Sequence, residues 1–335
     1  MLGAIVIVAP ENREEVEGGA TPIQQGTPLV CAEVLGRSVV GRMVEEFRRA
    51  GIELTSVIGN ISSAPACAGM DSAAKIDLCS PEEAWQAATQ QLLAFKQSGV
   101  EGILVVRAGA YVDLDLKEAL QFHRENGQIV TRAFDKEGPL DIWIIDPSGV
   151  VEGMDILSVL GTAETARYMV RGYVNRLGRP RDLRRLAADG LTARCRLRPQ
   201  GKEIRPGVWM DEGAHVHRDA RIVAPAFIGR GARVAEQCLI TRCSSIEGNS
   251  HVDYGTVVED SSILSNSYVG IGLDLAHSIV DGNNLLNLER DVIMEVSDPR
   301  LIRENRVQRR GRNRQSPVVF GLAGARFAPA EEGSR

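Results

Sequence analysis

Histidines and cysteines are the side chains in this sequence whose types and spacing could support chemistry at neutral pH. His215 and His251 stand 36 residues apart, and either imidazole could act as a general base. His217 and His277 lie in the same part of the chain, but a metal cage of three histidines needs closer pairing than these positions provide. The alternative is that all four are surface histidines on a structural scaffold. The six cysteines contain no C-x-x-C pair, which favours reduced thiols over a disulfide or zinc site.

The composition narrows the classes of protein to which the chain could belong. A length of 335 residues suggests two domains, and a hydrophobic content of 44% is ordinary for globular proteins. The formal net charge of -5 argues against a nucleic-acid binder. No apolar run reaches the roughly 18 residues that span a bilayer, and "MLGAIVIVAP" lacks the basic segment of a signal peptide. We therefore expect a cytoplasmic protein without a transmembrane segment.

A strict six-residue period runs through the C-terminal half of the sequence. Nine aliphatic residues recur at this spacing, and a small residue precedes each of them by two positions. Neither a helix nor a strand has this period, so it indicates stacked short units that bury a central column of single side chains. We expect the column to hold through Leu264 and to slip before Val269. The aliphatic positions are Val216, Ile222, Ile228, Val234, Ile240, Ile246, Val252, Val258 and Leu264, and the small ones are Ala214, Ala220, Ala226, Ala232, Cys238, Ser244, Ser250, Thr256 and Ser262.

These two columns resemble the hexapeptide repeats of left-handed parallel β-helices. The resemblance implies three six-residue sides per coil and about three coils. Some members of that family are acyltransferases that use a histidine on the coil as general base. His251 is the matching candidate, since it stands one place before a column residue and so points outward. No long loop interrupts the repeats to shape a site for an acyl donor, which favours a structural role.

The N-terminal half alternates apolar segments with amphipathic ones. Ser38 is placed to begin one helix, and Ser80 with Pro81 to begin the next. Short apolar strands separated by helices predict a mostly parallel sheet covered on both faces, with ligands bound beyond the carboxyl ends of the strands. Strands are expected over 3–9, 54–59, 102–108, 128–134 and 141–146, and helices over 36–51 and 80–99.

Two stretches of this half resemble sugar-1-phosphate nucleotidyltransferases, the nucleotide-sugar pyrophosphorylases. They are "TPLVCAEVLGRSVVGRMVEEFRRAGIELTSVI" (27–58) and "GILVVRAGAYVDLDLKEAL" (102–120). The resemblance implies a Rossmann-like nucleotidyltransferase-type α/β domain followed by a left-handed β-helix, an order found in enzymes that make nucleotide sugars. It places contacts to a nucleotide or sugar at Arg13, Thr27, Arg37, Arg107 and Gly109, and a magnesium site, if the protein is active, at Asp113 and Asp115.

The sequence departs from that family where the chemistry is most demanding. Nucleotidyl transfer needs a phosphate cradle, a metal ion and nearby cations. Here glutamates occupy positions 11, 14, 15 and 17 of the first loop, where the triphosphate should lie. The lysine expected from the family aligns with Thr27, and the expected metal-binding aspartate aligns with Gly109. Asp113 and Asp115 remain as possible metal ligands, although Asp113 also suits the cap of the following helix.

These departures lead to a ranked set of functional expectations. The first is a catalytically degenerate pyrophosphorylase-like protein, a pseudoenzyme that serves as a regulatory or scaffold subunit in sugar-nucleotide or surface and exopolysaccharide biosynthesis. The alternatives are an active sugar-1-phosphate nucleotidyltransferase with a displaced site and a hexapeptide-repeat acyltransferase. The expected partners are a nucleotide or nucleotide sugar and further copies of the chain, assembled through residues 205–290.

The same patterns divide the chain into four parts. Residues 1–160 form the expected α/β domain, and 161–204 a helical linker whose arginines coat a solvated face. Residues 205–295 form the expected β-helix. Residues 296–335 form a basic tail, for which we expect disorder because six arginines fall between 303 and 314.

Overall fold

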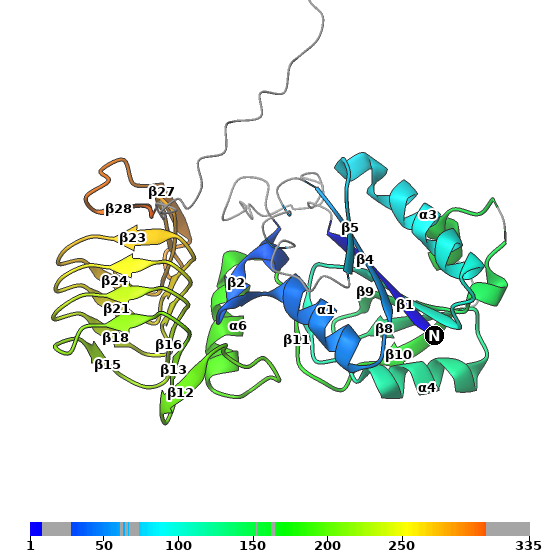
Figure 1. The fold of residues 1–335 in the computed structure, drawn as a ribbon, viewed down its shortest axis with the longest axis horizontal. Helices are drawn as coiled ribbons and strands as arrows, with labels where there is room; N and C mark the ends of the chain where they lie inside the picture. Colours follow the sequence, from blue (N-terminus) through cyan, green and yellow to red (C-terminus); the bar gives the residue numbers. More distant parts are fainter. Residues whose placement is uncertain are drawn as a thin grey trace, which may run out of the picture. The chain divides into compact units, whose positions relative to one another are not determined.

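The first half of the chain folds around a mixed, mostly parallel β-sheet (Figure 1). The structure is a computed structural model, and it describes residues 1–8, 28–60, 63, 66, 74–151, 153–161 and 165–305. In these residues the sheet has seven strands in the order β10-β8-β9-β6-β1-β4-β5, and only β9 runs antiparallel to its neighbours. The strands are β1 (Leu2–Val8), β4 (Leu54–Gly59), β5 (Ala74–Leu78), β6 (Gly102–Arg107), β8 (Val130–Phe134), β9 (Pro139–Ile145) and β10 (Thr165–Met169).

Helices cover both faces of this sheet, as the sequence predicted. Alternate residues of β1 enter two separate buried clusters, one with Ala4 and Val6 and the other with Ile5 and Ile7. The first cluster includes apolar residues of α1 (Val39–Arg49), α4 (Leu116–Asn126) and α6 (Pro180–Leu191). The second includes those of α3 (Ala84–Gln97) and α5 (Ile156–Leu160).

The helix boundaries follow local capping chemistry. The Ser38 side chain accepts a hydrogen bond from Gly41 N at 3.1 Å and begins α1, which confirms the predicted cap. The short 3-10 turn Pro81–Glu83 leads into α3, and the Glu83 carboxylate accepts from Ser80 N. At the end of α4, Gly127 adopts the left-handed conformation with φ of 63°.

The expected helical linker of residues 161–204 differs from the structure in its first part. Thr165–Met169 is strand β10 and pairs with β8 at one edge of the sheet. The short strand β11 (Val174–Asn175) pairs with β7 (Tyr111–Val112), and among the described residues of this segment the α-helix is α6. The arginines were expected to be solvated, but Arg184 is buried and donates to Asp260 at 2.6 Å. The segment contributes to the fold because its main chain pairs with β8 and the Tyr168 side chain is buried in the first cluster.

The second half of the described chain is rich in strands that pair in parallel across three sheets (Figure 1). The first sheet contains β12 (Lys202–Arg205), β13 (Val208–Met210), β16 (Ala226–Ile228), β19 (Ser245–Ile246), β22 (Ser262–Ile263), β25 (Ser278–Asp281), β26 (Asn284–Asn287) and β27 (Val292–Glu295). The second contains β14 (His215–Val216), β17 (Arg233–Val234), β20 (His251–Val252), β23 (Ser267–Val269) and β28 (Ile302–Glu304). The third contains β15 (Arg221–Ile222), β18 (Leu239–Thr241), β21 (Val257–Glu259) and β24 (Asp274–Ala276). We call residues 202–304 the repeat region.

The aliphatic column is buried along most of its predicted length. Ile240, Ile246, Val252 and Val258 are fully buried in one cluster, and Ile222 pairs with Ile240 eighteen positions later. The prediction fails at its end, because Ile263, not Leu264, is the partner of Ile246.

The cause of this slip is a shortened turn. Three residues separate β18 from β19, whereas two, Asp260 and Ser261, separate β21 from β22. Later pairs are therefore seventeen residues apart, as for Val252 and Val269. Leu264 turns to the other side and packs in the cluster of the N-terminal half.

Three small residues of the second column form hydrogen bonds between successive layers of strands. The hydroxyl groups of Ser244, Ser250 and Thr256 each donate to a main-chain carbonyl fourteen residues ahead, at 3.2, 2.7 and 2.6 Å. Each also accepts from a main-chain N–H seventeen residues ahead, at 3.1, 3.3 and 3.1 Å. Buried main-chain groups at the corners are thus paired between successive layers of strands.

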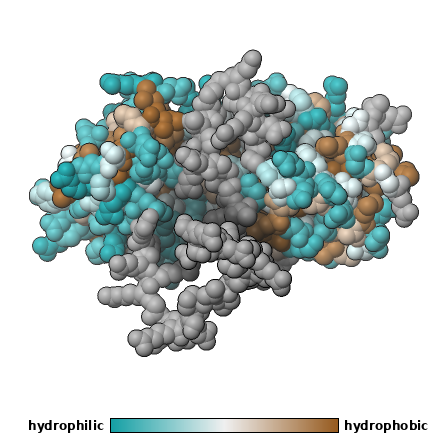
Figure 2. Space-filling view, turned by 90° about the horizontal axis from the view of Figure 1, so that it is seen from above, coloured by the Kyte–Doolittle hydropathy of each residue, from teal (hydrophilic) through white to brown (hydrophobic). Residues whose placement is uncertain are grey.

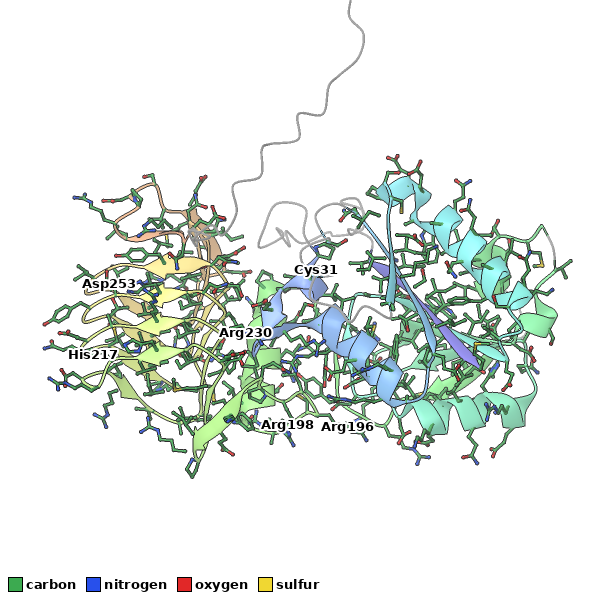
Figure 3. All side chains as sticks on the ribbon, viewed as in Figure 1. Cys31, Arg196, Arg198, His217, Arg230 and Asp253 are labelled. Carbon is green, nitrogen blue, oxygen red and sulfur yellow. The ribbon has the colours of Figure 1, made fainter. Side chains whose placement is uncertain are left out.

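A buried hydrogen-bonded contact joins the repeat region to the first half of the chain. The turn between β2 (Glu33–Val34) and β3 (Arg37–Ser38) directs the N–H groups of Leu35 and Gly36 at the Glu247 carboxylate, at 2.9 and 2.8 Å. Arg42 of α1 donates to the carbonyls of Val34, Leu35 and Arg198, each at 2.8 Å. Arg198, whose carbonyl accepts one of these hydrogen bonds, lies on the segment that follows α6 (Figure 3).

The described chain ends with strand β28, which pairs antiparallel with β23. Residues 302–304 therefore belong to the folded structure, although the expected tail began at 296. The rest of that expectation concerns residues 306–335, which lie outside the described residues.

Candidate functional site

The carboxyl ends of β1, β4 and β6 lie at one edge of the seven-stranded sheet. From β1 the chain first adds β4 on one side and later β6 on the other, both parallel to β1. In open α/β sheets such a reversal of strand order opens a crevice in which ligands bind. The residues at the end of β6 and directly after it are therefore candidates for a ligand-binding site.

Two arginines and one aspartate form a charged cluster at this edge. Asp141 of β9 lies 3.1 Å from Arg132 of β8 and 3.7 Å from Arg107 at the end of β6. The side chains are about one-third exposed, at 33% for Arg107, 30% for Arg132 and 39% for Asp141. Two guanidinium groups share one carboxylate, so the cluster carries a net positive charge and keeps N–H donors for an anion.

The cluster is held in place by its neighbours in the sheet. The Arg132 Nε donates to the Leu140 carbonyl at 3.0 Å, and its guanidinium lies 4.9 Å from the centre of the Trp143 ring. Arg107 was identified from the sequence, whereas Arg132 and Asp141 were not. Their proximity depends on the antiparallel insertion of β9 between β6 and β8, which no local pattern indicates.

Gly109 follows β6 and faces open space. A Cβ atom built at this position meets no heavy atom within 4 Å. The position contributes no side chain to the site, and an aspartate could be accommodated there without steric conflict.

Asp113 is a buried structural residue and does not cap α4, so the predicted cap is wrong. Its carboxylate accepts from Tyr111 Oη at 2.7 Å and from Arg196 N at 2.8 Å. Burial raises the pKa of Tyr111, which keeps the phenol protonated as a donor. The cap is Asp115, which accepts from Lys117 N and Glu118 N at 3.1 Å each, because α4 begins at Leu116.

Both carboxylates named as possible metal ligands, Asp113 and Asp115, are bound by donors of the protein itself. Both carboxylate oxygens of Asp113 already accept hydrogen bonds from protein donors. Asp115 directs its carboxylate at the first turn of α4. In the described part of the chain, no group of three or more histidine, cysteine, aspartate or glutamate side chains could hold a metal ion.

Arg37 lies away from the cluster at Arg107. It pairs with Glu45 of α1 and lines a recess with Glu53 and Thr55, which stand at the amino end of β4. The structure thus places Arg37 near the opposite edge of the sheet. Arg13 and Thr27, together with the glutamate-rich loop, lie outside the described residues.

His251 lies on the outward side of β20, as its place before a column residue predicted. It pairs with Arg233 and Tyr268 of the neighbouring strands, and its ring meets that of Tyr268 edge-on at 5.5 Å. Burial lowers the pKa of His251, and the nearby Arg233 and Arg303 act in the same direction, whereas Asp253 acts against them. His215 stands two strands away in the same sheet.

Other titratable side chains on this side of the repeat region form local pairs. His217 contacts Glu236 at 3.4 Å, and Tyr268 donates to Asp253 at 2.7 Å. Figure 3 shows His217 and Asp253 at the border of the stacked strands that points away from the first half of the chain. Tyr268 thus contacts both the ring of His251 and the carboxylate of Asp253.

Comparison with known proteins identified no relative of this chain. No protein-family model matches the chain, and no curated protein matches it. Among the described residues, no helix is both long enough and apolar enough to cross a membrane.

Proposed function

We propose that the chain is a catalytically degenerate relative of nucleotide-sugar pyrophosphorylases. In this proposal the seven-stranded sheet and its helices form a Rossmann-like nucleotidyltransferase-type domain, and the repeat region winds as a left-handed parallel β-helix. The protein acts as a regulatory or scaffold subunit in sugar-nucleotide or surface polysaccharide biosynthesis. It binds a nucleotide or nucleotide sugar without transferring it.

The β-helix assignment is supported by the pairing of the strands. Each parallel strand pairs with one that lies seventeen or eighteen residues further along the chain, which matches three short sides per coil. The aliphatic column is buried in the middle of the three sheets. Repeating layers of this kind bury one side chain per side against the next layer.

One observation supports the proposed loss of catalysis: Asp113 and Asp115 both form structural hydrogen bonds. Nucleotidyl transfer joins two anions, and a metal ion supplies much of the stabilisation of the transition state. The position of the family's metal-binding aspartate is Gly109, which has no side chain. The two nearest carboxylates form structural hydrogen bonds, Asp113 with Tyr111 and Arg196, and Asp115 with the first turn of α4.

The Arg107–Arg132–Asp141 cluster supports retained binding. Arg107 stands at the carboxyl end of β6, and the net positive charge of the cluster favours an anion such as a diphosphate. Binding through this cluster alone has no metal contribution, so we expect dissociation constants in the range of tens to hundreds of micromolar, or about -5 to -6 kcal/mol.

Calorimetric titration with nucleoside diphosphates and with UDP- and GDP-sugars tests this proposal. We expect at least one of these ligands to bind, and Arg132→Ala to weaken its binding by about tenfold, or 1.4 kcal/mol. Arg124→Ala on the exposed side of α4 is the control and should leave affinity unchanged. Gly109→Asp should make the affinity magnesium-dependent, because it returns a carboxylate to an open position. Binding of none of these ligands, or equal affinity in the Arg132 variant, would remove the support for a ligand site here.

A further inference from the structure

Strand β27 leaves an apolar edge at one end of the eight-stranded sheet. In the strand order of the described residues β27 is last, with β26 as its only neighbour. Its side chains Val292, Ile293 and Met294 are 45%, 46% and 45% exposed. Figure 2 looks onto the molecule from the side on which β27 and β28 lie, and hydrophobic atoms gather there between hydrophilic ones. An exposed apolar edge strand is a template for pairing with another strand.

The direction of the backbone groups in β27 follows from one hydrogen bond. Val296 N donates to Asn283 O at 2.8 Å, so the backbone groups of residue 296 point toward β26. Because these groups alternate along an antiparallel strand, those of Met294 and Val292 also point toward β26. The N–H and C=O groups of Ile293 and Glu295 therefore point outward, where a further strand could bind them.

The opposite edge of the same sheet is protected in a way that β27 is not. Strand β12 at that edge reads Lys-Glu-Ile-Arg, and all four residues are exposed. Charged side chains on an edge strand, lysine in particular, oppose pairing with another chain. Strand β27 carries a single charged residue, Glu295, at its end.

We propose that β27 pairs antiparallel with β27 of a second copy of the chain, across a two-fold axis that passes beside Met294. Two-fold symmetry requires that one residue faces its own copy. With Met294 opposite Met294, Ile293 of each copy faces Glu295 of the other. These are the two residues whose backbone groups point outward, so they exchange reciprocal pairs of hydrogen bonds.

Electrostatic repulsion disfavours the adjacent register, in which Ile293 would face its own copy. If Ile293 faced its own copy, Glu295 would lie opposite Asp291 of the other chain, and this like-charge contact would occur twice by symmetry. In the proposed register Glu295 faces an aliphatic side chain. The contact lies just beyond residues 205–290, where sequence reasoning placed the assembly surface. It depends only on the described strands and is independent of the proposed function.

Light scattering and cross-linking test the dimer and its register. We expect the full-length protein to run at twice its 36.3 kDa mass at tens of micromolar. In an antiparallel pair without mutual hydrogen bonds the Cα atoms stand about 4.5 Å apart, within the range of a disulfide. Met294→Cys should therefore form a disulfide-linked dimer on mild oxidation. The matched variant Ile293→Cys should not, because it faces Glu295, and the unmodified protein sets the background from its own cysteines.

A proline at the outward position tests the hydrogen bonds. Ile293→Pro removes an N–H that points away from β26, so the fold should persist with an unchanged circular dichroism spectrum while the dimer dissociates at least tenfold more readily. A monomeric unmodified protein at these concentrations would overturn the proposal. So would a dimer that survives Ile293→Pro, or one that cross-links through position 293 in place of 294.

Discussion

Replacing Ile240 with aspartate is expected to abolish cooperative folding of the repeat region. Ile240 is fully buried and pairs with Ile222 on one side and Val258 on the other, so its side chain has no route to solvent. The substitution removes apolar contacts and places an unpaired carboxylate in the column. Together these effects cost about 4 kcal/mol or more, which is a large part of the stability of an ordinary domain.

Circular dichroism and thermal melting would measure this loss. The matched control is Leu239→Asp, which places the same charge on the neighbouring residue of β18, where the side chain is partly exposed. We expect that variant to melt close to the unmodified protein. If Ile240→Asp kept the native spectrum and a cooperative transition, the aliphatic column could not be the core of this region.

Replacing Arg42 with alanine should cause the second large effect, a loss of about 3–5 kcal/mol in the free energy of unfolding. Arg42 is 8% exposed, and its guanidinium satisfies the main-chain carbonyls of Val34, Leu35 and Arg198. The N–H of Leu35 in turn donates to Glu247 of the repeat region. Without Arg42 these carbonyls lose their partner, and the buried Glu247 loses the nearby positive charge that favours its ionised form. Arg49→Ala, on an exposed side chain of the same helix, should change stability by less than about 0.5 kcal/mol.

The same variant should change the pH dependence of stability. Burial, together with Glu33, raises the pKa of Glu247 to about 8 from an ordinary value of 4.5. A carboxyl group with a raised pKa in the folded state stabilises the fold below pH 4.5, and this stabilisation is lost as the pH rises toward 8. Removing Arg42 raises the pKa further, so urea unfolding should show a steeper loss of stability above neutral pH. An unchanged pH profile would mean that the two charges do not interact.

The sequence predicted those parts of the fold that follow from local periodicity. The apolar runs at 3–9, 54–59 and 102–108 became β1, β4 and β6, and Ser38 begins α1 as expected. The column failed only at Leu264, where a turn lost one residue. Turn length is set by the geometry of the corner rather than by the repeat, so the periodic pattern did not reveal the shift.

The candidate site was predicted less completely, because its contacts are distant in sequence. Asp113 has the local pattern of a helix cap, but its partner Arg196 lies 83 residues away. Arg107 could be identified from the end of its strand, whereas Asp141 joins it only through the position of β9 in the sheet. Capping patterns report neighbouring residues, and they carry no information about which loops meet in space.

Pyrophosphate release by the purified full-length protein is the most direct test of a degenerate nucleotidyltransferase. The assay contains magnesium, a sugar 1-phosphate and each nucleoside triphosphate in turn. We predict no release above that of reactions without protein, because Gly109 provides no metal ligand and Asp113 and Asp115 are held by structural hydrogen bonds. Clear turnover that disappears in a folded Asp113→Asn variant would contradict this account and would place an active centre at that carboxylate.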